Sequence, residues 1–95
     1  MGGWTYIMTT GPRGVLYVGV AADHGQRVYA HRTGAGSAFC RRYGLNRLVW
    51  NLHHDRIDDA IDHEKRLKRW RRAWKIRLIE EANPDWRDLY ETLSG

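Results

Sequence analysis

The strongest constraint on the fold of this chain lies near its N-terminus, where two short strand-like segments follow each other closely. Residues 4–8 and 15–20 are rich in aromatic, β-branched and other apolar side chains, and the segment between them contains a Gly-Pro pair and a closing glycine. Such turn residues between two apolar runs favour a hairpin of antiparallel strands. The chain is therefore expected to begin with a two-stranded unit.

Each of these segments carries a tyrosine, and the register of the hairpin decides whether the two can act together. If Met8 faces Val15, Tyr6 faces Tyr17, and the two phenol hydroxyls lie within reach of a common point. A slip of one residue would move one tyrosine to the other face of the sheet.

The rest of the chain predicts a helix, a third strand and further helices. The expected elements are a helix over residues 23–33, a loop over 33–42, a strand over 47–52, helices over 55–69 and 72–82, and a short helical piece over 86–93. Asp55 is expected to cap the helix that it begins. This order suggests an α/β fold in which helices pack on a small antiparallel or mixed sheet.

Length and composition indicate one globular domain over residues 1–95, with 42% hydrophobic residues in a chain of 95. No apolar run approaches the roughly 18 residues of a membrane span, and the start lacks a basic stretch followed by an apolar core. A single cysteine, Cys40, excludes an internal disulfide and fits a reducing compartment. We therefore expect a cytoplasmic protein without membrane association.

The charge indicates an acidic partner, since the formal net charge is +5 and eight of the 16 Lys and Arg residues lie in residues 65–77. A solvated helix face or a surface for anionic lipid would also carry such charges. Acidic side chains that would neutralise the stretch at helical spacing are almost absent from it, which favours phosphate contacts and hence DNA, with RNA also possible. The candidate nucleic-acid-binding residues are Arg41, Arg42, Lys65, Lys68, Arg69, Arg72 and Lys75.

Two motifs resemble those of the GIY-YIG nucleases. Tyr17-Val18-Gly19 matches the second half of that name, and Trp4-Thr5-Tyr6 matches the first, with Trp4 in place of the family's glycine. The tail over residues 70–75 and 83–87 resembles that of small, stand-alone bacterial members. The resemblance implies a sandwich of helices on a three-stranded, mainly antiparallel sheet, and a metal-dependent DNA endonuclease that hydrolyses phosphodiester bonds. The candidate catalytic residues that match in order are Tyr6, Tyr17, Arg27, His31, Glu64 and Asn83.

Glu64 is the most informative of these residues. Positions 57, 60, 61, 64, 67 and 71 form one stripe of the predicted helix, and four apolar residues, Ile57, Ala60, Ile61 and Leu67, make that stripe apolar, so this carboxylate points toward the core. Burial of an unpaired carboxylate is costly, so a cation must compensate. A metal ion, Arg27, or a neighbouring Lys or Arg could do so. The family resemblance implies that Glu64 holds the catalytic Mg²⁺ or Mn²⁺.

The other candidates each have two interpretations. Arg27 and His31 are four residues apart and share a helix face, where they could contact the scissile phosphate or simply lie in solvent. A phenol is a poor base at neutral pH unless a cation lowers its pKa, so a catalytic Tyr6 or Tyr17 requires the metal or Arg27 nearby. Asn83 matches a late asparagine of the family, but it would equally end the helix before a proline.

Two departures from the family motifs leave open whether this chain is catalytically active. Repair-nuclease members carry a lysine directly after the Tyr-Val-Gly glycine, where this chain has Val20, and Trp4 replaces a glycine. The alternative is a non-catalytic nucleic-acid-binding module of the same fold.

The five histidines show no familiar metal-ligand spacing, and His53 and His54 are expected at the surface. With no appended DNA-binding domain expected, sequence specificity should be low.

Overall fold

The computed structural model describes residues 2–22, 44–45 and 47–90, and in this part of the chain three strands are followed by two helices. The elements are β1 (Gly3–Thr9), β2 (Leu16–Ala21), β3 (Arg47–His54), α3 (Ile57–Arg69) and α4 (Arg72–Ala82). The helix predicted over residues 23–33 and the loop over 33–42 lie outside the described residues. So do Arg27, His31, Cys40, Arg41 and Arg42.

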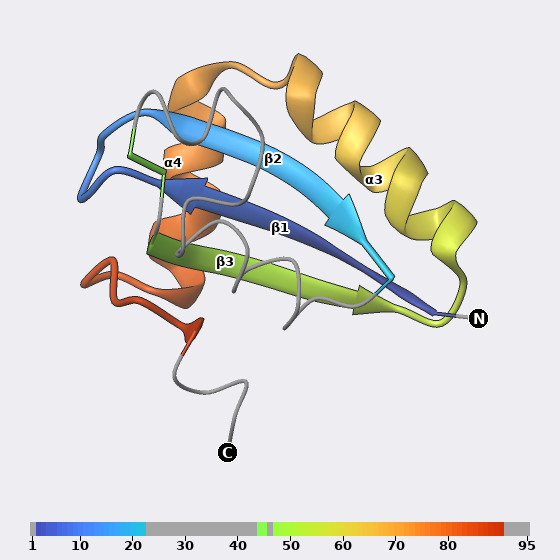
Figure 1. Ribbon diagram of the computed structural model, residues 1–95. Coiled ribbons are helices and arrows are strands. Elements are labelled where there is room, and N and C mark those ends of the chain that lie inside the picture. The colour runs from blue at the N-terminus through green and yellow to red at the C-terminus, as the bar shows by residue number, and fades with distance from the viewer. Residues whose placement is uncertain (1, 23–43, 46, 91–95) are drawn as a thin grey trace.

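The three strands form one antiparallel sheet in the order β2-β1-β3, so the first strand is central. Both described helices lie on the same side of this sheet, α3 along β1 and β2 and α4 behind the end that carries the β1–β2 turn (Figure 1). The predicted α/β fold with a three-stranded antiparallel sheet is confirmed. β3 continues to His54, two residues beyond its predicted end at residue 52.

The hairpin register differs from the predicted one by two residues. Met8 pairs with Tyr17, and Tyr6 pairs with Gly19, so the expected Tyr6–Tyr17 pair is wrong. The reason is the turn, in which Gly14 N donates to Gly11 O at 2.9 Å and the last strand pair is Thr9 with Leu16. Because the shift is an even number of residues, both tyrosines still lie on the same face.

Gly19 explains why this register is favourable. A Cβ atom at Gly19 would lie 2.5 Å from both Cζ and Oη of Tyr6, so the tyrosine ring occupies the space that any other residue at position 19 would fill. Tyr6 is only 1% exposed and packs with Met8 and Leu48. The close approach of a side chain to the strand therefore requires glycine here.

Apolar side chains cover both faces of the sheet. One cluster contains Tyr6, Met8, Ala21, Leu45 and Leu48. The other joins the sheet to the helices and contains Ile7, Val18, Val49, Trp50, Leu67, Ile79 and Trp86. A β-bulge opposite Ile7 and Met8 makes Val49 the extra residue of β3, and it lets Val49 and Trp50 both join the helix-side cluster.

Two local predictions about helices are wrong. Arg56, not Asp55, is the N-cap residue of α3, and no side chain caps it. Asp58 and Asp59 instead provide negative charge in the first turn, where the helix dipole favours it. In the short helical piece predicted over 86–93, residues 86–89 are not helical, because Trp86 adopts a left-handed backbone conformation with φ of 55°. Tyr90 is helical, and residues 91–93 lie outside the described residues. The predicted bounds of α4 are confirmed.

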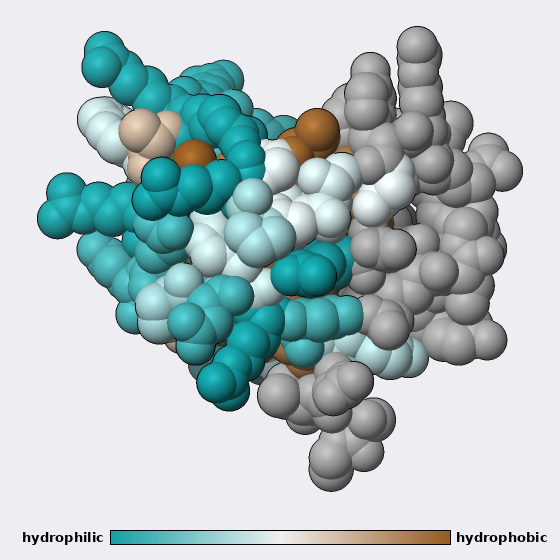
Figure 2. Space-filling view, turned by 90° about the vertical axis from the view of Figure 1, so that its left-hand side faces the viewer, coloured by the Kyte–Doolittle hydropathy of each residue, from teal (hydrophilic) through white to brown (hydrophobic). Residues whose placement is uncertain are grey.

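The surface at the end with α4 and the β1–β2 turn is mostly hydrophilic, with only small hydrophobic patches (Figure 2). Within the described ranges, neither helix is both long and apolar enough to cross a membrane.

Candidate active site

The two tyrosines of the motifs differ in accessibility. Tyr6 lies in the central strand and is buried, whereas Tyr17 lies in β2, an edge strand, and is only partly buried. Both point to the face opposite the helices, since they alternate with Ile7 and Val18. Tyr17 is therefore the more accessible of the two tyrosines.

Glu64 approaches the sheet from the other face. The helix that carries it is positioned by Thr5, whose hydroxyl donates to the Ala60 carbonyl at 2.8 Å, one turn before Glu64. The Glu64 side chain is 14% exposed, as its position in the apolar stripe predicts. Its Oε1 atom lies 3.3 Å from Nζ of Lys68, so a neighbouring lysine balances the carboxylate charge.

β2 is an edge strand of the sheet, and it carries side chains on both faces. α3 packs against both β1 and β2, and Tyr17 projects from β2 on the opposite face. Val20, at the position of the family's lysine, pairs with Thr5 and so lies on the α3 face. In this chain Lys68 supplies a cation on that side of the sheet.

The donor set can be compared with what a divalent metal ion needs. In the part of the chain that the structure describes, no group of three or more His, Cys, Asp or Glu side chains is arranged to hold a metal ion. Mg²⁺ usually keeps several waters and uses one or two carboxylates together with phosphate oxygens of the substrate. A single shielded carboxylate such as Glu64 fits that kind of site.

The basic side chains over residues 65–77 have more partners than the sequence suggested. Lys68 pairs with Glu64, and Arg77 pairs with Glu81 at 3.4 Å. Arg72 Nη2 donates to the carbonyl of Gly14 at 2.6 Å and also to that of Arg13, so it ties α4 to the hairpin turn. Burial, together with the charge of Arg72, lowers the pKa of Lys75. Lys65, Arg66, Arg69 and Arg71 are exposed.

Two exposed tryptophans lie within the same surface. Trp70 and Trp74 pack edge to face with ring centroids 6.1 Å apart, and the Arg71 guanidinium lies 5.9 Å from the centroid of the Trp74 ring. Large exposed aromatic side chains beside arginines are typical of surfaces that contact nucleic acid.

The Asn83 side chain forms three hydrogen bonds with the protein backbone. Its Nδ2 atom donates to Val49 O at 3.1 Å and to Arg87 O at 2.9 Å, and its Oδ1 atom accepts from Arg87 N at 3.0 Å. Val49 is the bulged residue of β3, whose ladder is interrupted there. Asn83 thus satisfies a carbonyl at the bulge and holds the segment after α4 against the sheet.

Asn83→Ala is expected to lower the free energy of unfolding by about 2–4 kcal/mol, because it leaves buried backbone groups without partners. Urea denaturation measures this loss. Cleavage per folded molecule should stay unchanged at a temperature where the variant is folded. A slower rate with unchanged stability would instead assign Asn83 to the reaction.

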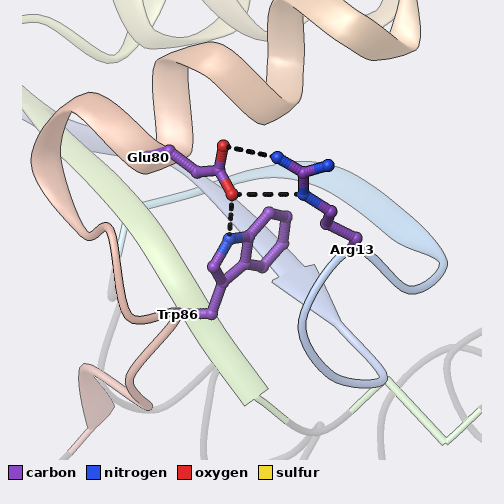
Figure 3. A network of polar contacts seen from close by, with 3 residues as sticks. All are labelled: Arg13, Glu80 and Trp86. Atoms are coloured by element: carbon purple, nitrogen blue, oxygen red, sulfur yellow. Dashed lines mark hydrogen bonds and ion pairs between the residues drawn. The ribbon is translucent and has the colours of Figure 1, made fainter.

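A second polar network was not predicted from the sequence. Glu80 of α4 accepts hydrogen bonds from the indole Nε1 of Trp86 at 2.8 Å and from the Arg13 guanidinium at 3.2–3.3 Å (Figure 3). The Trp86 and Arg13 hydrogen bonds lower the pKa of Glu80. These residues are up to 73 positions apart in the chain, so no local pattern reveals the network.

The contact between two histidines, His54 and His63, was also not predicted from the sequence. His54 Nε2 and His63 Nδ1 lie 3.2 Å apart, and the His63 ring packs edge to face on Trp50 with centroids 5.7 Å apart. Burial, His54 and Arg66 all lower the pKa of His63. The two rings come from β3 and α3, nine residues apart, which is not a recognised ligand spacing. Of the two histidines expected at the surface, His53 is exposed, and His54 is partly buried and contacts His63.

Comparisons with known proteins agree with this geometry. Residues 2–77 match the family model of the GIY-YIG catalytic domain. A UPF0213 protein of Aeromonas salmonicida is 35% identical over 94 residues, which cover 97% of this chain and 69% of that protein. The UPF0213 protein SA0446 of Staphylococcus aureus is 32% identical over 68 residues, covering 72% of this chain and 83% of that protein. The solution NMR structure of the UPF0213 protein BH0048 from Bacillus halodurans superimposes with a TM-score of 0.58 at 25% identity and covers 93% of each chain.

Proposed function

This chain belongs to the GIY-YIG family, and from this we propose that it is a divalent-metal-dependent DNA endonuclease that hydrolyses phosphodiester bonds with low sequence specificity. The observation that carries the proposal is the shielded Glu64 carboxylate on a helix that packs against the edge strand bearing the accessible Tyr17. In this proposal a substrate phosphate would bind at the outer edge of β2, between the face that carries Tyr17 and the face that carries Glu64. Edge strands offer such access because no further strand covers them.

In this proposal Glu64 would hold Mg²⁺ or Mn²⁺, which would supply Lewis-acid stabilisation of the charge that develops on the phosphate. On metal binding Glu64 would give up its ion pair with Lys68, whose ammonium could then contact a phosphate oxygen. Tyr17 takes a proton from the attacking water. Arg27 and His31, outside the described residues, keep their proposed contacts with the phosphate and the water.

Affinity for DNA would come from the basic surface over residues 65–77. The exposed cations Lys65, Arg66 and Arg69 can neutralise phosphates without breaking an ion pair or hydrogen bond seen in the described part of the chain, unlike Lys68, Arg72 and Arg77. Arg71 is also exposed and lies beside the Trp74 ring. Backbone contacts of this kind carry no base information. Low sequence specificity follows.

A nicking assay tests the proposed function. Supercoiled plasmid should be converted to the open circular form in the presence of Mg²⁺ or Mn²⁺ and should remain intact with EDTA. DNA binding without nicking under all metal conditions would favour the non-catalytic module, for which Val20 and the Glu64–Lys68 ion pair are the supporting observations.

The tyrosines should differ in their effects. We expect Tyr17→Phe to slow cleavage by at least about tenfold with little loss of stability, because a general base typically contributes 10²–10⁴-fold. Tyr6→Phe should change stability more than rate, since the Tyr6 ring is enclosed by the core and the Gly19 backbone. Single-turnover rates and urea denaturation of both variants measure the two effects. Cleavage by Tyr17→Phe at the wild-type rate would rule out Tyr17 as the base.

A further inference from the structure

We propose that His54 and His63 form a binding site for one Zn²⁺ ion, separate from the magnesium site assigned to Glu64. The two ring nitrogens lie 3.2 Å apart and come from different elements, the end of β3 and the middle of α3. Two imidazole nitrogens bound to one tetrahedral Zn²⁺ at about 2.0–2.1 Å are separated by about 3.3 Å. The pair therefore already has the spacing of two ligands of one ion, and the nitrogen that donates in the pair would lose its proton, to the other nitrogen of its own ring or to water, when the metal binds.

The rings are held in this arrangement by their surroundings. His63 packs against Trp50, which is buried in the cluster between sheet and helices. His54 pairs with Gly3 across the sheet and lies on the α3 face, because strand residues alternate. His53, the adjacent residue, consequently points to the other face, where its ring contacts Trp4 with centroids 4.9 Å apart.

An open cavity of about 640 Å³ gives an ion access to His54, and its lining decides which metal can bind. Asp59 and Asp62 line the cavity, but so do three cations, Lys65, Arg66 and Arg69. The net charge of the cavity lining does not attract a hard cation, so the affinity for a metal ion must come from bonds to imidazole nitrogen. Zn²⁺ forms such bonds readily, whereas Mg²⁺ prefers oxygen ligands.

Two protein ligands leave the remaining positions to water or to an added ligand, since no third His, Cys, Asp or Glu completes a cluster within the described ranges. The site is thus open. The cations of the cavity lie where they could hold an anion beside the metal.

Calorimetric titration of the full chain with Zn²⁺ alone tests this site. One Zn²⁺ should bind per chain, and His54→Ala and His63→Ala should each weaken binding at least tenfold. His53→Ala is the matched control, since it removes the neighbouring histidine on the opposite face, and it should change affinity less than twofold. An equal loss in His53→Ala and His54→Ala would overturn the assignment.

Because His63 supports Trp50, its alanine variant could unfold, and a measurement on the wild-type chain avoids that problem. Histidine ring ¹⁵N spectra should show Zn²⁺ shifting Nε2 of His54 and Nδ1 of His63 together, while Mg²⁺ at the same concentration shifts neither. If millimolar Zn²⁺ leaves both nitrogens unshifted, or shifts only other histidines, His54 and His63 form a plain hydrogen-bonded pair and the proposal is wrong.

Discussion

Glu64→Gln is expected to reduce metal-dependent DNA cleavage to background while leaving DNA affinity within about twofold of wild type. The amide keeps the shape of the side chain but removes the negative charge that the metal requires. It also frees Lys68, so the positive surface is not weakened. Plasmid nicking in Mg²⁺ and a binding titration in EDTA measure the two quantities separately.

Glu81→Gln provides the matched control. Glu81 also forms an ion pair with a basic residue four positions away, Arg77, but its side chain is 65% exposed, compared with 14% for Glu64. The same chemical change at this exposed pair should leave cleavage at the wild-type rate, since exposed pairs contribute little. Equal losses in both variants, or wild-type cleavage by Glu64→Gln, would remove Glu64 from the metal site.

Gly19→Ala is expected to destabilise the fold by about 3 kcal/mol, at the upper end of overpacking effects. The added methyl group would lie 2.5 Å from the Tyr6 ring, which cannot move outward because it is packed within the core. The midpoint of urea denaturation should fall strongly. Tyr6 and Tyr17 share this strand pair, so cleavage should fall as well.

Gly11→Ala is the control for glycine replacement itself. Position 11 lies in the hairpin turn, and a Cβ atom there would have no neighbour within 4 Å. The free energy of unfolding of Gly11→Ala should stay within about 0.5 kcal/mol of wild type, as for most surface substitutions. Similar stabilities of the two variants would show that the Tyr6 ring can rearrange, and that Gly19 is not required by packing.

Local patterns in the sequence were enough to predict the hairpin and the two helices. Apolar runs separated by turn residues predicted the hairpin, the 3.6-residue period and the acidic first turn predicted α3, and Asn83-Pro84 predicted the end of α4. The same period predicted that Glu64 faces inward, and the structure confirms its shielding. These features follow from side chains within a few residues of one another, which sequence displays directly.

Features that depend on contacts between distant residues could not be predicted from the sequence. The register came from the fit of the Tyr6 ring over Gly19 and from the hairpin turn. At the bulge in β3, the carbonyl of Val49 accepts a hydrogen bond from Asn83, which lies 34 residues away in the chain. The approach of His54 to His63 likewise depends on how α3 packs on the sheet, because side-chain packing between elements sets such distances and leaves no periodic trace in the sequence.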